Sequence, residues 1–298
     1  MAVNVLAHRS FRLSIGDIQF ASEGVVRPLD FEFMVQRDKT ITPNNIKLTI
    51  KGLAKDTRET ISQLAGGDGV TVRLEVGYQE NLGQIFFGVL RKAESWREGG
   101  VWLTQISGGD GEKAIRTAKI SKTFKKGTKV SEVIRALVKA LGVNEGTLNN
   151  TLTALEVSGY LSGGNAIQKA LTVSGDAATA LEDFMLSCGF EWSIQDGAFL
   201  AGPRGQAVVP GTGPLLTSRT GLVGTPNLDK DGNVVGKALM HADLIPGKVF
   251  RVESDRVTGN FIAKKTKHEG SSQGQEWYVS FVGTPPAPGS PAATLETT

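Results

Sequence analysis

The stretch of sequence from residue 246 to residue 283 reads PGKVFRVESDRVTGNFIAKKTKHEGSSQGQEWYVSFVG. Its runs of β-branched and aromatic residues predict strands at Lys248–Ser254, Asn260–Lys267 and Glu276–Val282. Glycine-containing turns separate these runs, and a Gly-Thr-Pro sequence follows the last one. Short apolar runs bounded by turns are typical of an antiparallel meander or a small barrel. The stretch therefore predicts an antiparallel β module.

The same pattern occurs earlier in the chain. Residues 69–76 read GVTVRLEV and residues 247–254 read GKVFRVES, so both contain Gly-x-x-apolar-Arg-apolar-Glu. The later matches are Gly83-Gln-Ile-Phe with Gly259-Asn-Phe-Ile, Trp102 with Trp277, Ile106 with Phe281, and Gly108 with Gly283. The strands match in phase, and a slip of one residue would turn each set of side chains to the other face. We therefore predict two related β-barrel modules, with chance similarity of two meanders as the alternative.

Composition limits the classes of protein that fit. A chain of 298 residues accommodates about two domains, and 40% hydrophobic residues are enough to form a core. The formal net charge of +3 is too small to argue for nucleic-acid or membrane binding. The single cysteine excludes a disulfide within the chain. Residues 1–12 lack a signal-like apolar core, and no run approaches the roughly 18 apolar residues of a membrane span. We expect folding in the cytoplasm of the producing cell, without a membrane segment.

The first part of the chain alternates in the manner of half-buried strands. Residues 11–20 form two runs with a turn at Gly16-Asp17, and similar alternation covers residues 29–36 and 46–50. A short helix is predicted at Lys55–Leu64, before the first copy of the meander. Residues 1–110 are therefore predicted to form the first β-barrel module.

Residues 111–203 are predicted to form an α+β insertion, because the apolar period changes there. A helix is expected from an N-cap at Thr128 to Gly142. A second helix runs over about Asp176–Leu186, with Ser174 or Gly175 leading in and Gly189 ending it. Asp196-Gly197 predicts a tight hairpin turn. The polar, glycine-rich stretch 144–164 is left unassigned.

Residues 204–284 are predicted to form the second β-barrel, starting at Val208 and Val209. Another apolar segment covers Leu215–Val223, and residues 238–245 lead to the meander. Residues 285–298 are rich in Pro, Ala, Ser and Thr and predict a flexible tail. The predicted fold class is mainly β, with two tandem tube-like β-barrel domains flanking an α+β domain.

Motifs for metal binding and catalysis are absent from the sequence. His8, His241 and His268 form no HxxxH or HxH pair, and Cys188 has no CxxC partner. Cys188 with His268 would be a possible nucleophile pair, but Cys188 lies on the apolar face of a predicted helix, where cysteine behaves as a small hydrophobe. His268 follows a predicted strand and is expected to face a turn.

The remaining candidates are weak. Ser162, in Gly159-Tyr-Leu-Ser-Gly, misses the GxSxG nucleophile pattern by one residue. The glycines of 202–213 match no phosphate loop. Asn227-x-Asp229-x-Asp231-Gly232 resembles the first half of a calcium loop, but Ala238 stands where a bidentate Glu is required. Core or interface positions are expected for Trp102, Trp192 and Trp277. We predict no catalytic, cofactor-binding or metal-binding residues and no cofactor.

A series of short motifs in the second half resembles a known family. In order, the motifs are Ser174-Gly-Asp, Cys188-Gly-Phe-Glu-Trp, Thr220-Gly-Leu-Val-Gly-Thr-Pro, Leu244-Ile-Pro-Gly, Lys267-His-Glu-Gly and Glu276-Trp-Tyr-Val. The chain resembles the baseplate hub proteins of contractile bacteriophage tails, which are related to late control D proteins and to the N-terminal part of type VI secretion spike proteins. The resemblance covers about residues 10–284 and is strongest after residue 165.

This resemblance implies a structural, non-enzymatic late protein. It implies a homotrimer whose barrels form a pseudo-sixfold ring between a hexameric tail tube protein and a trimeric central spike protein. Other baseplate proteins would be further partners, and DNA would pass through the lumen without specific binding. The expected location is the tail tip or baseplate of a virion assembled in the host bacterial cytoplasm, or a phage-derived particle such as a tailocin or secretion system. The alternatives are a tail-associated peptidoglycan hydrolase, and an insertion that binds a baseplate protein or the cell wall through a LysM-like surface.

Overall fold

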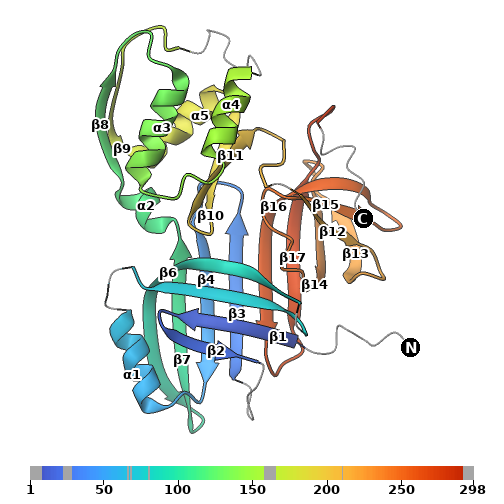
Figure 1. Ribbon diagram of the computed structural model, residues 1–298. Helices are drawn as coiled ribbons and strands as arrows, with labels where there is room; N and C mark the ends of the chain where they lie inside the picture. The colour runs from blue at the N-terminus through green and yellow to red at the C-terminus, as the bar shows by residue number, and fades with distance from the viewer. Residues whose placement is uncertain are drawn as a thin grey trace.

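The structure is a computed structural model that describes residues 9–22, 29–65, 67, 69–79, 81–157, 166–209 and 211–290, with the side chains of 155–157 excepted. The N-terminal and C-terminal parts of the chain both contribute strands to one 13-stranded, mostly antiparallel sheet. An α+β unit lies beyond one end of the central strands of this sheet (Figure 1). The predicted fold class, mainly β with an α+β insertion, is confirmed.

The N-terminal module contains most of the strands that alternation predicted. Its elements are β1 (Arg9–Ile15), β2 (Ile18–Ala21), β3 (Asp30–Asp38), β4 (Asn44–Lys51), α1 (Lys55–Leu64), β5 (Thr71–Tyr78), β6 (Asn81–Glu98) and β7 (Val101–Asp110). β1 and β2 form the predicted hairpin, and Gly16 in its turn has a φ of +56°. The helix predicted at Lys55–Leu64 is confirmed at the predicted bounds.

The core of this module lies between two crossing layers. β1, β5 and the first part of β6 pass in front of β3, β4 and β7 (Figure 1). Most inward positions of the strands are apolar, and Phe31, Leu48 and Val72 are fully buried between the layers. Phe11 packs edge-on against Phe31, with 4.5 Å between ring centroids. This alternation of buried and exposed positions leaves one face of the β3, β4 and β7 layer to polar side chains.

The α+β insertion has a core of its own. Its elements are α2 (Glu112–Thr117), β8 (Lys119–Phe124), α3 (Val130–Leu141), α4 (Leu148–Val157), β9 (Leu171–Asp176), α5 (Ala177–Ser187), β10 (Phe190–Gln195) and β11 (Ala198–Pro203). Six residues of α3 are buried at helical spacing, and Gly142 ends the helix with a φ of +68°. The hairpin turn at Asp196-Gly197 is confirmed, and both of its residues have positive φ. α4 lies in the stretch that was left unassigned.

Two helix starts differ from the expectation. The prediction of Thr128 as the N-cap of α3 is wrong: Lys129 is the N-cap residue, because the Thr128 hydroxyl donates instead to the carbonyl of Lys125 at 2.8 Å. Asp176 caps α5 by accepting from the Thr179 amide at 2.8 Å. Ser174 and Gly175, which were expected to lead into the helix, are part of β9.

The first strand of the C-terminal module lies later in the chain than predicted. Its strands are β12 (Thr212–Leu216), β13 (Leu222–Leu228), β14 (Val234–Leu239), β15 (Val249–Glu253), β16 (Thr258–Ser271) and β17 (Trp277–Thr284). Val208 and Val209 do not start a strand, since both amides donate to the carbonyl of Gly247. The apolar run 215–223 is interrupted by a turn in which Thr217 and Thr220 bind each other.

The two modules have the same strand order, β3-β4-β7-β6-β5 in one and β13-β14-β17-β16-β15 in the other. The match of Gly83 with Gly259 is not in register with the ladders: Gly259 is opposite Val252, whereas Leu74, the match of Val252, is opposite Phe86. This part of the sequence match is therefore displaced by three residues, and the β5–β6 ladder has a register shift directly after Leu74. The shared strand order supports the predicted duplication and extends it from three strands to five.

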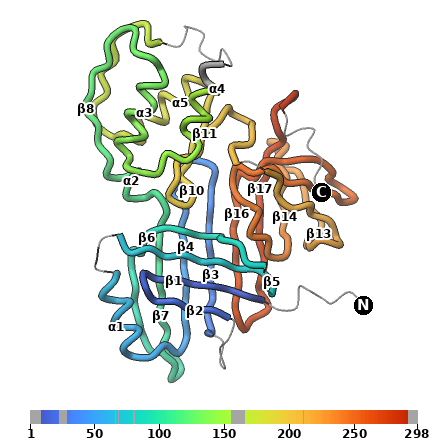
Figure 2. Tube along the Cα trace, in the orientation of Figure 1, coloured from blue at the N-terminus to red at the C-terminus, as the bar shows by residue number. Residues whose placement is uncertain are grey.

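The modules are joined edge to edge rather than linked loosely. β16 pairs with β3 over seven residue pairs, from Lys265 opposite Asp38 to Ser271 opposite Glu32, and the two strands run side by side in Figure 2. Met240 and Trp277 of the C-terminal module lie in the core of the N-terminal module. At the end of the chain, the amide of Ala287 donates to Gly205 at 2.9 Å, while the rest of the predicted flexible tail, residues 291–298, lies outside the described residues.

Candidate functional site

The outward side chains of β14, β17, β16, β3, β4 and β7 form one polar surface that crosses both modules, here called the polar face. The ladders place the outward residues in rows across the strands. One such row contains Tyr278, Glu269, Met34, Lys47 and Ser107. A shallow hollow of about 350 Å³ lies on this face, among Glu32, Lys47, Lys237, Glu269 and Tyr278. The polar face is therefore continuous from one module to the other.

Charges of opposite sign alternate on the polar face. The ammonium of Lys267 lies 2.6 Å from a carboxylate oxygen of Glu269, and that of Lys51 lies 2.9 Å from Glu32. The hydrogen bond to Glu32 raises the pKa of Lys51 above its usual value. Because these cations have acidic neighbours, the face presents little net charge to a polyanion that passes along it.

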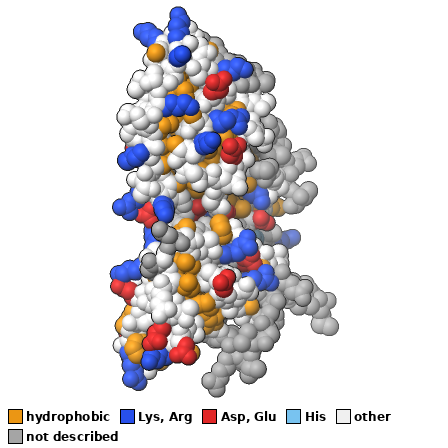
Figure 3. Space-filling view, turned by 60° about the vertical axis from the view of Figure 1, so that its left-hand side comes forward, with side chains coloured by type: hydrophobic (Ala, Val, Ile, Leu, Met, Phe, Trp, Pro, Cys, Tyr) orange, Lys and Arg blue, Asp and Glu red, His pale blue; other side chains and the backbone are white. Residues whose placement is uncertain are grey.

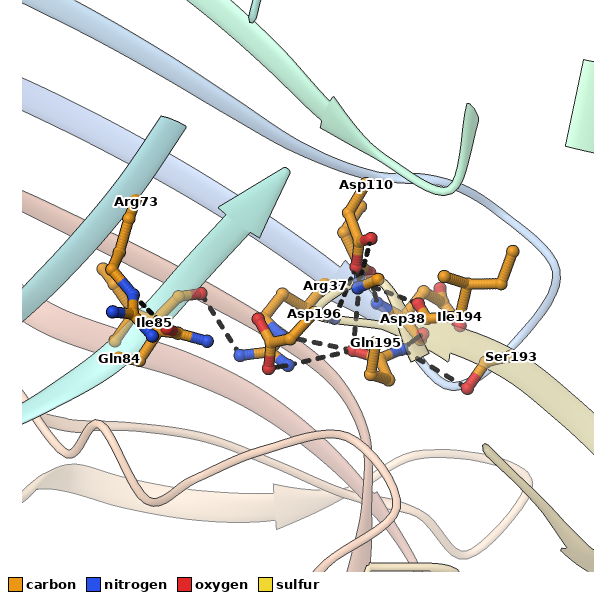
Figure 4. Close-up of polar contacts among 12 residues, drawn as sticks. Arg37, Asp38, Arg73, Gln84, Ile85, Asp110, Ser193, Ile194, Gln195 and Asp196 are labelled. Carbon is orange, nitrogen blue, oxygen red and sulfur yellow. Dashed lines mark hydrogen bonds and ion pairs between the residues drawn. The ribbon is translucent and has the colours of Figure 1, made fainter. Parts of the chain in front are cut away.

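A second feature is a group of polar residues where the insertion meets the β strands, here called the interdomain cluster: Arg37, Asn44, Asp110, Gln195 and Asp196. Arg37 is only 2% exposed, and its guanidinium donates to Asp196 Oδ2 at 2.8 Å and to Gln195 Oε1 at 3.2 Å (Figure 4). Asp110 accepts from the backbone amides of Asp196 at 2.7 Å and of Gly197 at 2.9 Å. The hairpin turn of the insertion is thus held by side chains from the strand ends of the N-terminal module.

Burial controls the ionisation of this cluster. Burial raises the pKa of Asp110, although the Gly197 amide and the Asn44 side chain work in the opposite direction. Nearby, His268 on β16 is 1% exposed. Burial and the positive charge of Arg37 lower the pKa of His268 to about 3, so this imidazole is neutral near neutral pH. Its Nε2 atom lies 3.2 Å from the carbonyl oxygen of His241.

The position of His268 corrects the sequence prediction. It was expected at a turn, but β16 continues to Ser271, and His268 pairs with Val279 on one side and Val35 on the other. Cys188 is buried in the core of the insertion, and burial raises the pKa of its thiol. His268 lies on β16 in the large sheet, outside the insertion, so the structure does not bring the two residues together as a nucleophile pair.

The calcium-like sequence forms a plain turn between β13 and β14. Asp229 accepts from the backbone amides of Asp231 and Asn233 and from the side chain of Asn233, at 2.8 to 2.9 Å. These bonds lower the pKa of Asp229. Within the described ranges, no group of three or more His, Cys, Asp or Glu side chains could hold a metal ion. Ser162 and His8 lie outside the described residues.

The tryptophans expected at core or interface positions have different environments. Trp192 and Trp277 are both 2% exposed and belong to cores. Trp102 is 40% exposed at the end of the β6–β7 hairpin, where the guanidinium of Arg58 stacks 3.9 Å above its ring. The matched residues Trp102 and Trp277 therefore differ in one respect: only Trp277 is covered by the other module.

The interdomain cluster was not predicted from the sequence, although the phase of its residues along the strands is a signal for it. Phe31, Phe33 and Val35 are the inward residues of β3, and Arg37 is the next inward position. Asn44 and Asp110 likewise occupy inward positions at the ends of β4 and β7, and both are buried. A polar residue in phase with an apolar strand face signals a buried contact of this kind.

Comparisons with solved structures identify the fold. A tail protein from Neisseria meningitidis superposes with a TM-score of 0.60 at 10% identity, covering 93% of this chain and 96% of that one. The 43 kDa tail protein of prophage MuSo2 from Shewanella oneidensis gives 0.62 at 7% identity, covering 93% and 97%. The chain has the fold of phage tail proteins.

A third structure with this tail-protein fold is an E. coli component of the type VI secretion system, described as structurally similar to T4 bacteriophage tail proteins gp27 and gp5. It superposes with a TM-score of 0.52 at 10% identity, and the match covers 92% of this chain and 76% of that one. No protein-family model and no curated protein sequence matches the chain. Among the described residues, no helix is long and apolar enough to cross a membrane.

Proposed function

We propose that this protein is a structural hub of a bacteriophage tail or of a phage-derived injection machine. Three copies form a ring with pseudo-sixfold symmetry, which joins a hexameric tail tube to a trimeric central spike. The observation that carries this proposal is the pair of modules with one strand order, joined edge to edge in a single sheet. Two similar modules in each of three copies present six similar places to a sixfold partner.

We further propose a division of labour along the chain. Residues 1–110 and 204–284 act as the ring-forming modules, residues 111–203 form the insertion, and residues 285–298 form a tail. We assign the polar face to the wall of the channel. Its paired charges would let DNA pass without specific binding. The interdomain cluster fixes the insertion beyond the ends of β3, β4 and β7, where it can meet an axial partner (Figure 1). The role is structural rather than enzymatic.

Native mass spectrometry tests the ring. The expected result is a species of three times the mass of the chain, which binds the tube protein or the spike protein encoded by the same particle. A protein that stays monomeric at micromolar concentration and binds neither partner would overturn the proposal. Zymography on purified cell wall tests the structural role. We expect no lysis, and lysis that is abolished by one substitution in the insertion would favour a hydrolase instead.

A further inference from the structure

The contact between the two modules within one chain contains information about how copies meet. The first part of β16 pairs with β15, and the second part of the same strand pairs with β3 of the N-terminal module. An ion pair of 3.0 Å between Lys265 and Asp38 lies across this ladder. Paired in this way, Thr266, His268 and Gly270 of β16 are all buried. The second half of β16 is thus an edge that a neighbouring module completes.

The corresponding half of β6 has no such neighbour. β6 pairs with β5 through its first half and with β7 through its second half, as β16 does with β15 and β17. Within the described ranges, no strand pairs with the other edge of residues 91–98, and all of them except Ala93 are exposed. By the matched strand orders, the strand that would fill this edge is the counterpart of β3, which is β13.

β13 itself also has a free edge. It pairs with β14 alone among the strands of the described residues, and it ends one side of the sheet. Of the eight exposed large hydrophobic residues in the part of the chain that the structure describes, seven lie at or beside the free edges: Val89, Trp96, Val101 and Trp102 on β6 and β7, and Val223, Leu228 and Val235 on β13 and β14. Figure 3 shows the molecule from a side on which hydrophobic side chains form a band over the N-terminal module.

We propose that β13 of one copy pairs antiparallel with residues 91–98 of β6 in the next copy, so that the contact between copies repeats the contact of β3 with β16 inside each copy. This inference rests on the proposed ring and names the surfaces that form it. Exposed strand edges readily accept a further strand through backbone hydrogen bonds. Head-to-tail pairing of this kind closes when the rotation completes a ring.

The register of this contact follows from the ladders. In the N-terminal module Gly108 pairs with Ile46, and Ile46 pairs with Val35 on the next strand. In the C-terminal module the matched Gly283 pairs with Val234, and Val234 pairs with Leu228. Leu228 is therefore the counterpart of Val35. Leu228 is 55% exposed, whereas Val35, which pairs with His268 of the adjoining module, is fully buried.

The counterpart of His268 is found in the same manner. His268 pairs with Val279, and Ser95 pairs with Thr104. Thr104 and Val279 are matched positions, two residues from the matched tryptophans Trp102 and Trp277. Ser95 is therefore the counterpart of His268.

Within the chain, Val35 is directly opposite His268. The register between copies therefore places Leu228 opposite Ser95. Once this contact forms around the ring, the sheet β13-β14-β17-β16-β3-β4-β7-β6 of each copy has no free edge, and the polar face continues from copy to copy.

A designed disulfide tests the register. In Ser95→Cys/Leu228→Cys, mild oxidation should yield covalent dimers and trimers on a non-reducing gel, because directly opposite residues are within disulfide reach. The matched control is Glu94→Cys/Leu228→Cys, in which the thiol introduced at position 94 points to the other face of the sheet and should not form the bond. The native Cys188 is 3% exposed and does not compete.

A second variant keeps the test decisive if the double cysteine variant folds poorly. Leu228→Asp should shift the native mass from trimer to monomer with unchanged circular dichroism. Leu186→Asp, at an exposed residue of α5 away from both edges, should leave the trimer intact. A trimer that forms no disulfide between positions 95 and 228 and tolerates Leu228→Asp would overturn the edge pairing but leave the hub proposal standing. A wild-type chain that is monomeric would overturn both.

Discussion

The guanidinium of Arg37 and the carboxylate of Asp196 form an ion pair of 2.8 Å that links strand β3 to the hairpin turn of the insertion. Arg37 is 2% exposed and Asp196 is 30% exposed, so this pair supplies the counter-charge for a buried guanidinium. Leaving a buried charge without its counter-charge is among the more costly changes that a single substitution makes. The pair therefore fixes the insertion to the sheet.

Asp196→Asn tests this attachment. Asparagine accepts the left-handed conformation that Asp196 adopts, with a φ of +55°, so the turn is kept and the charge alone is lost. We expect a loss of about 2 kcal/mol in the free energy of unfolding, measured by urea denaturation. The control is Glu59→Gln, which removes an exposed ion pair with Lys55 and should cost less than about 0.5 kcal/mol. Equal effects of the two substitutions would contradict a buried role for Asp196.

The sequence predicts the elements of this protein better than their connections. Alternation located β3 and β4, and helical spacing located α3, because burial of one face determines those patterns locally. The pairing of β3 with β16 joins positions more than 220 residues apart in the chain, and no local pattern encodes it. The apolar segment predicted at Leu215–Val223 contains a turn in which Thr217 and Thr220 bind each other. The number of apolar residues in the segment does not reveal such a turn.

The interdomain cluster was predictable only in part. The phase of Arg37, Asn44 and Asp110 in their strands indicates burial, but their partners Gln195 and Asp196 belong to another unit. The hairpin turn that follows Gln195 was correctly predicted from its residue types, and nothing in those types shows what the turn contacts. Docking of one unit on another depends on the tertiary arrangement.

His268 should make stability depend on pH. Its pKa is lowered to about 3 in the folded protein, against an ordinary value of 6.5 in the unfolded chain. The unfolded state therefore takes up a proton first as the pH falls. The contribution of His268 is complete above pH 6.5 and is lost towards pH 3, at about 1.4 kcal/mol per pH unit.

Comparison with His268→Gln isolates this contribution. Burial raises the pKa of Asp110, which acts in the opposite sense, because the folded state then takes up that proton more readily as the pH falls. Both proteins contain Asp110, so its effect cancels in the difference between their pH profiles. Chemical denaturation at several pH values should give a shallower acid loss for the variant. An NMR titration showing His268 protonated near pH 6.5 would contradict the argument.

The turn between β13 and β14 should not respond to calcium. Both carboxylate oxygens of Asp229 are already occupied by bonds from residues 231 and 233. We expect the midpoint of thermal unfolding to be the same with millimolar calcium and with a chelator. Asp229→Ala should lower the midpoint of thermal unfolding in both conditions, because three hydrogen bonds of the turn lose their acceptor. A calcium-dependent rise in the midpoint that disappears in this variant would show that the site binds the ion.

The charge balance of the polar face predicts how the protein treats DNA. Glu32 and Glu269 lie 2.9 Å and 2.6 Å from the ammonium groups of Lys51 and Lys267. In Glu32→Gln/Glu269→Gln, Lys267 loses its acidic neighbour and Lys51 keeps only Asp30, at 3.6 Å, so both lysines become more available to phosphate groups. Each new phosphate contact adds about 0.9 to the slope of log affinity against log salt concentration. Fluorescence anisotropy with duplex DNA should therefore show tighter binding and a slope that is steeper by about 1 to 2.

The matched control for this prediction changes the net charge by the same amount at other places. Glu59 on α1 and Asp183 on α5 are both exposed and lie outside the polar face. Glu59→Gln/Asp183→Asn should leave both the affinity and the salt slope close to those of the wild type, since the added net charge is spread away from the lysines of the sheet. If both double variants bound DNA equally well, total charge alone would explain the binding, and the paired charges of the polar face would have no particular role in letting DNA pass.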